Sequence, residues 1–273
     1  MFLDRIVAQT RSDIERRKQE RPLEELRPLV RTQAAPHDLV KILKTDGKVH
    51  LIAEVKRASP SKGMLAPHLD PIELARVYED SGASAISVLT EPHFFLGSLD
   101  YLRAIKRTVE IPVLRKDFII DEYQVYEART YGADAILLLC AILDDAQLQH
   151  LLTVAHALDM RCLIETHTRQ EVQRAVASGA LLIGVNSRDL VTFEVYPELI
   201  RDLRPLIPPD RVVVAESGIR TAADASRLAR YNIQAMLVGE SLVTSNNIPA
   251  QMQVLLQATT GAWRNQGAEI NGL

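Results

Sequence analysis

The sequence has few cysteines and little excess of either charge. Only two cysteines occur in 273 residues, Cys140 and Cys162, and they lack metal-ligand spacing. We therefore expect neither a disulfide framework nor a metal site. The formal net charge at pH 7 is −3, so we expect no general attraction for nucleic acid. Any bound anion must be held by local groups.

Long apolar segments are also absent. No segment reaches the roughly 18 to 20 apolar residues that a membrane-spanning helix needs, and residues 1–17 become charged too early for a signal peptide. We therefore expect a cytoplasmic protein with no membrane partner. With 47% hydrophobic and 25% charged residues, the composition is typical of a globular domain, and we assign residues 1–273 to a single domain.

Eight short apolar segments rich in β-branched residues recur along the chain. They span residues 49–55, 83–89, 112–118, 134–140, 161–166, 180–186, 212–217 and 235–240. Separations of roughly 20 to 35 residues leave room for one helix between strands, which is typical of parallel strands with helices outside. Eight such units favour an α/β fold with a closed (β/α)8 TIM barrel over residues 49–260. A doubly wound open sheet is the alternative.

Helix start and stop signals separate the predicted strands. Asp70 and Ser98 each precede a helical pattern, and Gly82 and Gly132 each follow one just before the next strand. Capping side chains at helix starts and glycines at helix ends have these positions in known folds. The chain therefore repeats a cycle of strand, loop, helix and stop.

The first 48 residues precede the barrel. Leu3, Ile6, Val7 and Ile14 lie near helical spacing, so residues 1–48 are predicted to form an N-terminal helical extension. It would cover the barrel bottom, contribute to the substrate mouth, or form an oligomer contact, and we favour the mouth. The sequence is compatible with a monomer and does not fix the oligomeric state.

Polar side chains collect where the predicted strands end, which is the active face of such a barrel. Glu54 and Lys56 share one face of the first strand, because side chains at i and i+2 point the same way. By the same rule Lys116 and Phe118 face the pocket on the third strand. Asp117 is then expected to turn toward the helical layer as a structural partner.

Later strand ends add to this set: Glu165, Asn186, Arg188 and Glu216. One explanation is purely structural, in which buried charges satisfy one another in the pairs Glu54–Lys56, Glu165–Lys116 and Glu216–Arg188. However, the strand starts carry no comparable set. Convergence of so many polar groups at one end of the barrel therefore favours a functional site.

Two glycines follow the last two predicted strands, where barrels often bind phosphate through backbone N–H groups. Gly218 and Gly239 allow close approach of a ligand to the backbone. Ser59, Ser217 and Lys56 are further donors within the same set of loops. We therefore expect these loops to share one phosphate group.

The segment 57–63 has neither helical nor strand pattern and is expected to be a mobile cover over the pocket. Lys62 within it is either a contact to an anionic substrate or a solvated lysine. Glu240 follows Gly239, and because a carboxylate would repel phosphate, we expect it to turn outward. Ser241 would then be the nearer hydroxyl.

The motifs of these strand ends resemble, in order and spacing, those of the indole-3-glycerol phosphate synthase family: EVKRASPSKG, LRKDFIIDEYQVYEAR, LIET, IGVNSRDLVTFEV, VAESGI and VGESL. The resemblance covers nearly the whole chain, including the N-terminal extension. It implies a carboxy-lyase (EC 4.1.1.48) of tryptophan biosynthesis. This activity converts 1-(2-carboxyphenylamino)-1-deoxyribulose 5-phosphate into indole-3-glycerol phosphate, carbon dioxide and water, with no cofactor.

The resemblance also implies roles for single residues. Lys116 would be the general acid that protonates the substrate ketone, and Glu165 an acid/base for later proton transfers. Lys56 would assist dehydration, while Glu54 and Asn186 would orient the substrate. The residues around the phosphate would be Ser59, Ser217, Gly218 and Gly239. Arg188 and Glu216 would complete the circle of polar side chains at the barrel mouth, and Phe118 and Leu190 would contact the anthranilate ring.

Two other functions are compatible with such a barrel. A phosphoribosylanthranilate isomerase would be expected to carry a cysteine base at an early strand end, where this chain has Glu54 and Lys56. A barrel that serves only to bind a metabolite would be expected to lose its acid/base set, whereas Lys116 and Glu165 are both present. We therefore expect an enzyme acting on a small phosphorylated molecule.

Overall fold

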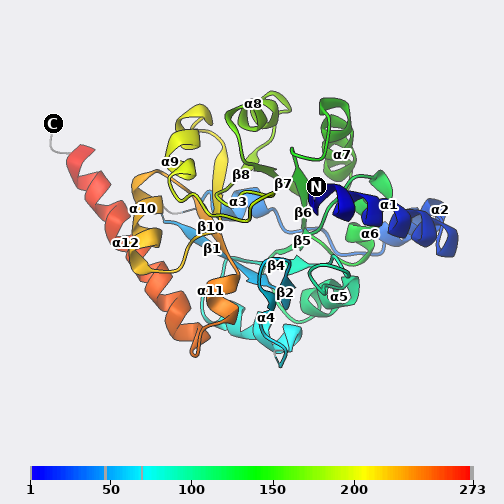
Figure 1. Ribbon diagram of the computed structural model, residues 1–273, viewed down its shortest axis with the longest axis horizontal. Coiled ribbons are helices and arrows are strands. Elements are labelled where there is room, and N and C mark those ends of the chain that lie inside the picture. The colour runs from blue at the N-terminus through cyan, green and yellow to red at the C-terminus, as the bar shows by residue number, and fades with distance from the viewer. Residues whose placement is uncertain (1, 46–47, 69, 271–273) are drawn as a thin grey trace.

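Eight parallel strands form a closed barrel in the computed structural model, which describes residues 2–45, 48–68 and 70–270, with side chains as far as residue 260 (Figure 1). The strands are β1 (His50–Val55), β4 (Ala85–Leu89), β5 (Val113–Lys116), β6 (Ala135–Leu139), β7 (Arg161–Thr166), β8 (Leu182–Asn186), β9 (Val212–Glu216) and β10 (Ala235–Val238). Strand β1 pairs with both β4 and β10, which closes the barrel and leaves it without a free edge. The predicted strands and closed barrel are confirmed.

Helices surround the barrel. Those that connect successive strands are α4 (Pro71–Asp80), α5 (Leu99–Lys106), α6 (Glu122–Thr130), α7 (Asp145–Ala157), α8 (Arg169–Ala177), α9 (Leu199–Leu203) with the 3-10 turn Arg204–Leu206, and α10 (Ala222–Arg230). Helices α11 (Glu240–Val243) and α12 (Ile248–Ile270) follow the last strand. The Asp70 side chain accepts the N–H of Ile72 at the start of α4, and Ser98 caps α5 in the same way. Gly82 adopts a φ of +93° after α4, as the predicted stop requires. None of the helices in the described ranges is long and apolar enough to cross a membrane.

The apolar core has two layers because side chains alternate along each strand. Leu114 points into the barrel and packs with Ile52 and Leu163, whereas Val113 packs against the outer helices. The interior layer is closed at the strand starts by α3 (Leu39–Leu43), whose Leu39 is fully buried against it. Among the residues that the structure describes, interior side chains thus fill the lower barrel, and the cavity lies at the strand ends.

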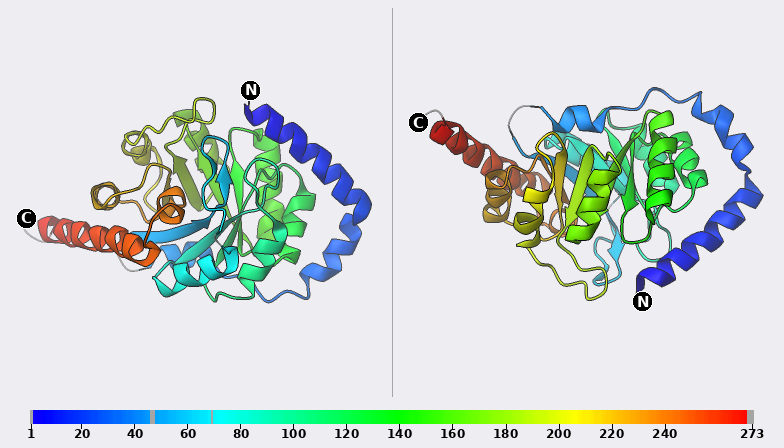
Figure 2. Two further views of the ribbon diagram at one scale, coloured as in Figure 1. Left: turned by 60° about the horizontal axis from the view of Figure 1, so that its bottom comes forward. Right: turned by 90° about the horizontal axis from the view of Figure 1, so that it is seen from above.

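The N-terminal extension spans the height of the barrel. Helices α1 (Phe2–Glu20) and α2 (Leu23–Val30) run along the outside, next to α6 (Figure 2). At the start of α1, the Phe2 ring lies 5.3 Å from that of Phe94 and 5.4 Å from that of Phe193, in the loops that follow β4 and β8. The start of α1 therefore lies beside two loops at the mouth, although none of its described residues lines the cavity, and α3 covers the bottom.

The segment after β1 differs from the prediction of a patternless loop. Strands β2 (Ala58–Ser59) and β3 (Gly63–Met64) form a short antiparallel ribbon. Gly63 makes the return with a φ of +66°, a conformation that costs glycine little. Two paired residues on each side are too few to leave an alternating pattern in the sequence.

Candidate active site

A cavity opens at the carboxyl ends of the strands, on the face where the helices begin. Its empty space is about 1110 Å³, including part of the open mouth, which is ample for a phosphorylated sugar joined to one aromatic ring. It is lined by every site residue that we predicted: Glu54, Lys56, Ser59, Lys116, Phe118, Glu165, Asn186, Arg188, Leu190, Glu216, Ser217, Gly218 and Gly239. The barrel therefore brings the whole predicted set together.

Lys116 lies at the centre of an acidic cluster. Its Nζ is 3.2 Å from Glu165 Oε2 and 3.6 Å from Glu216 Oε2. Burial alone would lower the pKa of this ammonium, but the carboxylates of Glu165, Glu216 and Glu54 outweigh burial and raise it. Lys116 is therefore protonated at neutral pH and points a proton into the cavity.

Glu165 and Glu216 are both buried, yet their environments separate their proton affinities. Burial raises the pKa of each carboxyl group. For Glu165, Lys116, His167 and Asn186 more than offset burial, so its pKa falls. For Glu216 the neighbouring Glu165 charge adds to burial, so its pKa rises well above the ordinary value. One cluster thus holds an ionised carboxylate beside a carboxyl group that retains its proton.

Glu54 and Lys56 form the second ion pair, with 2.6 Å between Nζ and Oε1. The loop after β10 passes directly over this pair at Gly239. A Cβ atom at Gly239 would lie 2.4 Å from Glu54 Oε1, so a larger residue there would displace the carboxylate. Glycine is required at this position because two parts of the site lie against each other.

The turn after β9 presents backbone to the same side of the cavity. Ser217 and Gly218 adopt consecutive left-handed conformations, with φ of 65° and 76°. Such a conformation is strained for serine and concentrates at functional sites. Ser241 also lines the cavity, but its hydroxyl donates to the Ile219 carbonyl at 2.8 Å. The Ser241 hydroxyl therefore already donates its proton to the backbone and not into the cavity.

Glu240 does not turn outward, contrary to the prediction. It lines the cavity, where Oε1 accepts from Arg220 at 3.0 Å and Oε2 lies 3.5 Å from Arg188. Lys62 of the β2–β3 ribbon lies 3.7 Å from the same carboxylate. Three cations hold the side chain over the rim, so Lys62 makes a contact across the mouth.

The three predicted ion pairs have different outcomes. The pairs of Glu54 with Lys56 and of Glu165 with Lys116 are present. The pair of Glu216 with Arg188 is wrong, because Arg188 contacts Glu240 and the carbonyl of Phe193 instead. Glu216 faces Lys116, and neither of its oxygens has a well-aligned hydrogen-bond partner in the described part of the chain.

Further residues complete the site. Phe95 lines the cavity, and its ring lies 6.0 Å from that of Phe118. Phe193, which also lines the cavity, and His167 were not predicted. His167 contacts Glu165 from behind, at 3.3 Å. His167 follows Glu165 by two residues, so the rule of shared strand faces was a usable signal for it. No such rule locates Phe193, which belongs to a long loop.

Comparisons with known proteins agree with one another over nearly the whole chain. A family model described as indole-3-glycerol phosphate synthase matches residues 3–255. An indole-3-glycerol phosphate synthase of Dehalococcoides mccartyi is 52% identical over 260 residues, covering 94% of this chain and 100% of the relative. One from Ruminiclostridium cellulolyticum is 45% identical over 261 residues, covering 93% and 98%.

Solved structures show the same barrel at much lower sequence identity. The 3-hexulose-6-phosphate synthase of Salmonella typhimurium matches with a TM-score of 0.62 and 15% identity, covering 78% of this chain and 100% of that one. A structure titled KGPDC, from Streptococcus mutans, matches with a TM-score of 0.63 and 10% identity, covering 79% and 99%. At such identities the likeness concerns the fold alone.

Proposed function

This chain belongs to the indole-3-glycerol phosphate synthase family, and we propose that the side chains at its barrel mouth carry out that family's reaction. The enzyme is a carboxy-lyase of tryptophan biosynthesis. Its substrate, 1-(2-carboxyphenylamino)-1-deoxyribulose 5-phosphate, closes a ring, loses carbon dioxide and loses water. The observation that carries the residue assignment is the Lys116 ammonium held among carboxylates inside the cavity.

Ring closure requires a proton on the ketone oxygen of the substrate. As the aromatic carbon that bears the carboxylate attacks the ketone carbon, negative charge develops on that oxygen. Lys116 is protonated, buried and directed into the cavity, so we assign it the role of proton donor. The new carbon–carbon bond leaves the ring non-aromatic, and departure of carbon dioxide restores its aromatic electrons.

Dehydration then removes the hydroxyl group that the ketone has become. Its departure as water requires a proton, and formation of the indole double bond requires loss of another from the neighbouring carbon. We assign these transfers to Glu165 with help from Lys56, while Asn186, which donates to Glu165 Oε1 at 3.1 Å, holds the carboxylate in place. Glu54 orients Lys56 through their 2.6 Å contact.

The two ends of the substrate differ in charge and polarity, and so do the two sides of the cavity. We propose that the phosphate lies against Ser217, Gly218 and Gly239, within reach of Ser59 and Lys56. The anthranilate ring would pack between Phe118 and Leu190. Arg188 and Glu216 complete the polar ring between the two ends.

Two experiments test this assignment. Mixing the purified protein with the carboxyphenylamino substrate should produce indole fluorescence, and absence of turnover would contradict the function. A structure with indole-3-glycerol phosphate bound should place phosphate against Gly218 and Gly239. Phosphate at the α3 end of the barrel would refute the site.

We propose a setting as well. The enzyme would act in the cytoplasm as a single-domain monomer and require no cofactor. Turnover should therefore be unchanged after dialysis against a strong metal chelator, and the sedimentation coefficient should correspond to one chain. Among the described residues, no group of His, Cys, Asp and Glu side chains is arranged to hold a metal ion.

A further inference from the structure

His167 is a buried imidazole directly behind the proposed acid/base residue. It follows β7, and its side chain is only 12% exposed. Its Nε2 lies 3.3 Å from Glu165 Oε1, and its Nδ1 lies 3.4 Å from Glu171 Oε2. One carboxylate therefore faces each ring nitrogen.

Glu171 is held firmly on the far side of this imidazole. It belongs to the first turn of α8, where its backbone N–H donates to the Thr168 hydroxyl at 3.2 Å. Its Oε2 accepts the backbone N–H of His167 at 2.6 Å. The carboxylate thus has a fixed position that does not depend on the protonation of the imidazole.

Because both ring nitrogens face carboxylates, the imidazole carries a proton on each. Burial alone would lower the pKa of His167, but Glu165 and Glu171 together raise it to about 10. The distances of 3.3 and 3.4 Å are those of ion pairs, and neither ring nitrogen has a well-aligned hydrogen-bond partner in the described ranges. The close N–H of the ring and the positive charge of the ring both lower the pKa of Glu165.

Charged and titratable groups surround the pair of Glu165 and His167 from several elements. They are Lys116 on β5, Glu216 on β9, Glu54 on β1, Glu171 and Arg174 on α8, Cys140 after β6 and Asp189 after β8. Within the cluster, Lys116 lies beside Glu165 Oε2, and His167 lies beside Oε1 of the same carboxylate. The imidazolium therefore adds a second positive charge on the side of Glu165 that Lys116 does not reach.

We propose that His167 is a positioning residue whose fixed positive charge keeps Glu165 ionised and directed at Lys116, and that Glu171 holds His167 in this charged state. The inference rests on the proposed role of Glu165 as acid/base. In the reaction, Glu165 must hold a proton only transiently. The imidazolium makes it a weaker base at rest and an effective acid once protonated.

Two substitutions test the charge rather than the shape. His167→Gln keeps an N–H donor near the position of Nε2 but removes the charge. Because a positioned acid/base group contributes about 100- to 10,000-fold in rate, weakening Glu165 without removing it should lower kcat by about 10- to 100-fold. KM should change little. The acidic limb of the kcat–pH profile should move to higher pH, because Glu165 would retain its proton more strongly.

Glu171→Gln should make the charge of His167 depend on pH near neutrality. Gln still accepts the backbone N–H of His167, but it no longer stabilises the imidazolium. A new loss of kcat should therefore appear as pH rises through the region near neutral, as the imidazole loses its proton. The double variant with His167→Gln should not show this additional pH dependence. Glu171→Asp, which restores the carboxylate, should recover the original profile.

A matched control is His150→Gln, at a surface His–Glu pair with Glu122 at 3.2 Å, which should leave the kcat–pH profile unchanged. Glu165→Gln separates this inference from the proposed function. If Glu165→Gln is inactive while His167→Gln and Glu171→Gln keep the original profile shape, His167 is merely structural and the inference is refuted. If Glu165→Gln itself is active, the proposed role of Glu165 fails instead. Should His167→Gln not fold, the profile of Glu171→Gln alone decides.

Discussion

Arg115 and Lys116 are neighbours in the chain, and each is a buried cation surrounded by carboxylates. They face opposite sides of β5, so one network lies between barrel and helices and the other lies at the open mouth. The Arg115 network is closed. Its guanidinium contacts Asp117 at 2.9 Å and Glu127 at 3.0 Å, and donates to the carbonyl of Gln124.

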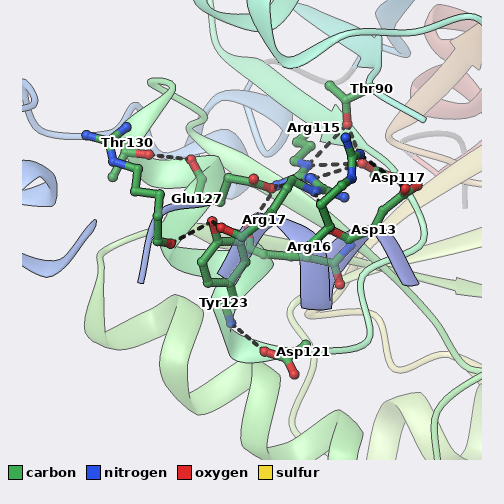
Figure 3. A network of polar contacts seen from close by, with 12 residues as sticks. Asp13, Arg16, Arg17, Thr90, Arg115, Asp117, Asp121, Tyr123, Glu127 and Thr130 are labelled. Carbon is green, nitrogen blue, oxygen red and sulfur yellow. Dashed lines mark hydrogen bonds and ion pairs between the residues drawn. The ribbon is translucent and has the colours of Figure 1, made fainter. Parts of the chain in front are cut away.

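Figure 3 shows how this closed network reaches the N-terminal extension, because Arg17 of α1 contacts Glu127 at 2.8 Å. In the Lys116 cluster, by contrast, both oxygens of Glu216 lack a well-aligned partner among the residues described. Buried polar groups are normally satisfied, and exceptions require an explanation. The polar groups of the Arg115 network are already paired within the protein, so they cannot also bind a ligand. The Lys116 cluster retains polar atoms without aligned partners, and these can bind one.

The largest expected difference between the two networks is the effect on turnover of removing one carboxylate from each. Glu165 lies between Lys116 and His167, and Glu127 lies between Arg115 and Arg17. Glu165→Gln should lower kcat by about 100- to 10,000-fold, because it removes the proposed acid/base group. Glu127→Gln should leave kcat within about threefold but lower the free energy of unfolding by about 3 to 5 kcal/mol, as expected when a buried ion pair is broken. Steady-state turnover and urea unfolding of both variants check this. If Glu165→Gln and Glu127→Gln lowered kcat equally, the distinction between a catalytic network and a structural one would be wrong.

A smaller effect concerns Glu216 and pH. Burial and the Glu165 charge raise the pKa of Glu216 from its ordinary value near 4.5 to about 8. Between these values the folded protein retains a proton that the unfolded chain has lost, so this group makes the free energy of unfolding fall as pH rises from about 4.5 to about 8. Glu216→Gln cannot titrate and should remove that part of the pH dependence. Urea unfolding of both proteins at about pH 5 and about pH 9 measures the change in the free energy of unfolding with pH. If this change is the same in Glu216→Gln as in the original protein, Glu216 is ionised in the folded state.

The smallest effect should come from the outer end of the closed network. Arg17 is partly exposed and contacts Glu127 from α1. Because partly exposed ion pairs contribute little, Arg17→Met should lower the free energy of unfolding by about 1 kcal/mol and leave kcat nearly unchanged. Arg16→Met, at an exposed neighbour, is the matched control. A large loss of kcat in Arg17→Met would mean that α1 acts on the site through this network.

The sequence predicted the barrel and the members of the site because both depend on local patterns. Strand ends are marked by apolar runs, and shared faces follow from a period of two residues. Lys116, Asp117 and Phe118 all border the cavity, but the Asp117 carboxylate turns away from it and accepts from Arg115. The outcome for Asp117 confirms this reasoning, since it contacts Arg115 on the helical side.

The partners within the site could not be predicted in the same way. Arg188 contacts Glu240 and not Glu216, because the loops after β8 and β10 meet across the mouth. Loop conformations of this kind depend on contacts between distant segments, which local patterns do not record. The position of α3 at the barrel bottom is a further example, since it depends on contacts between Leu39 and interior residues of strands that are distant in the sequence.

The most direct test of the account compares Lys116→Met with Arg115→Met, measuring kcat and the free energy of unfolding for both. We expect Lys116→Met to lose about 100-fold or more in kcat while remaining folded. Arg115→Met should lose about 3 to 5 kcal/mol of stability, while the fraction that stays folded turns over substrate at a rate close to that of the original protein. Near-normal turnover by Lys116→Met would contradict the account.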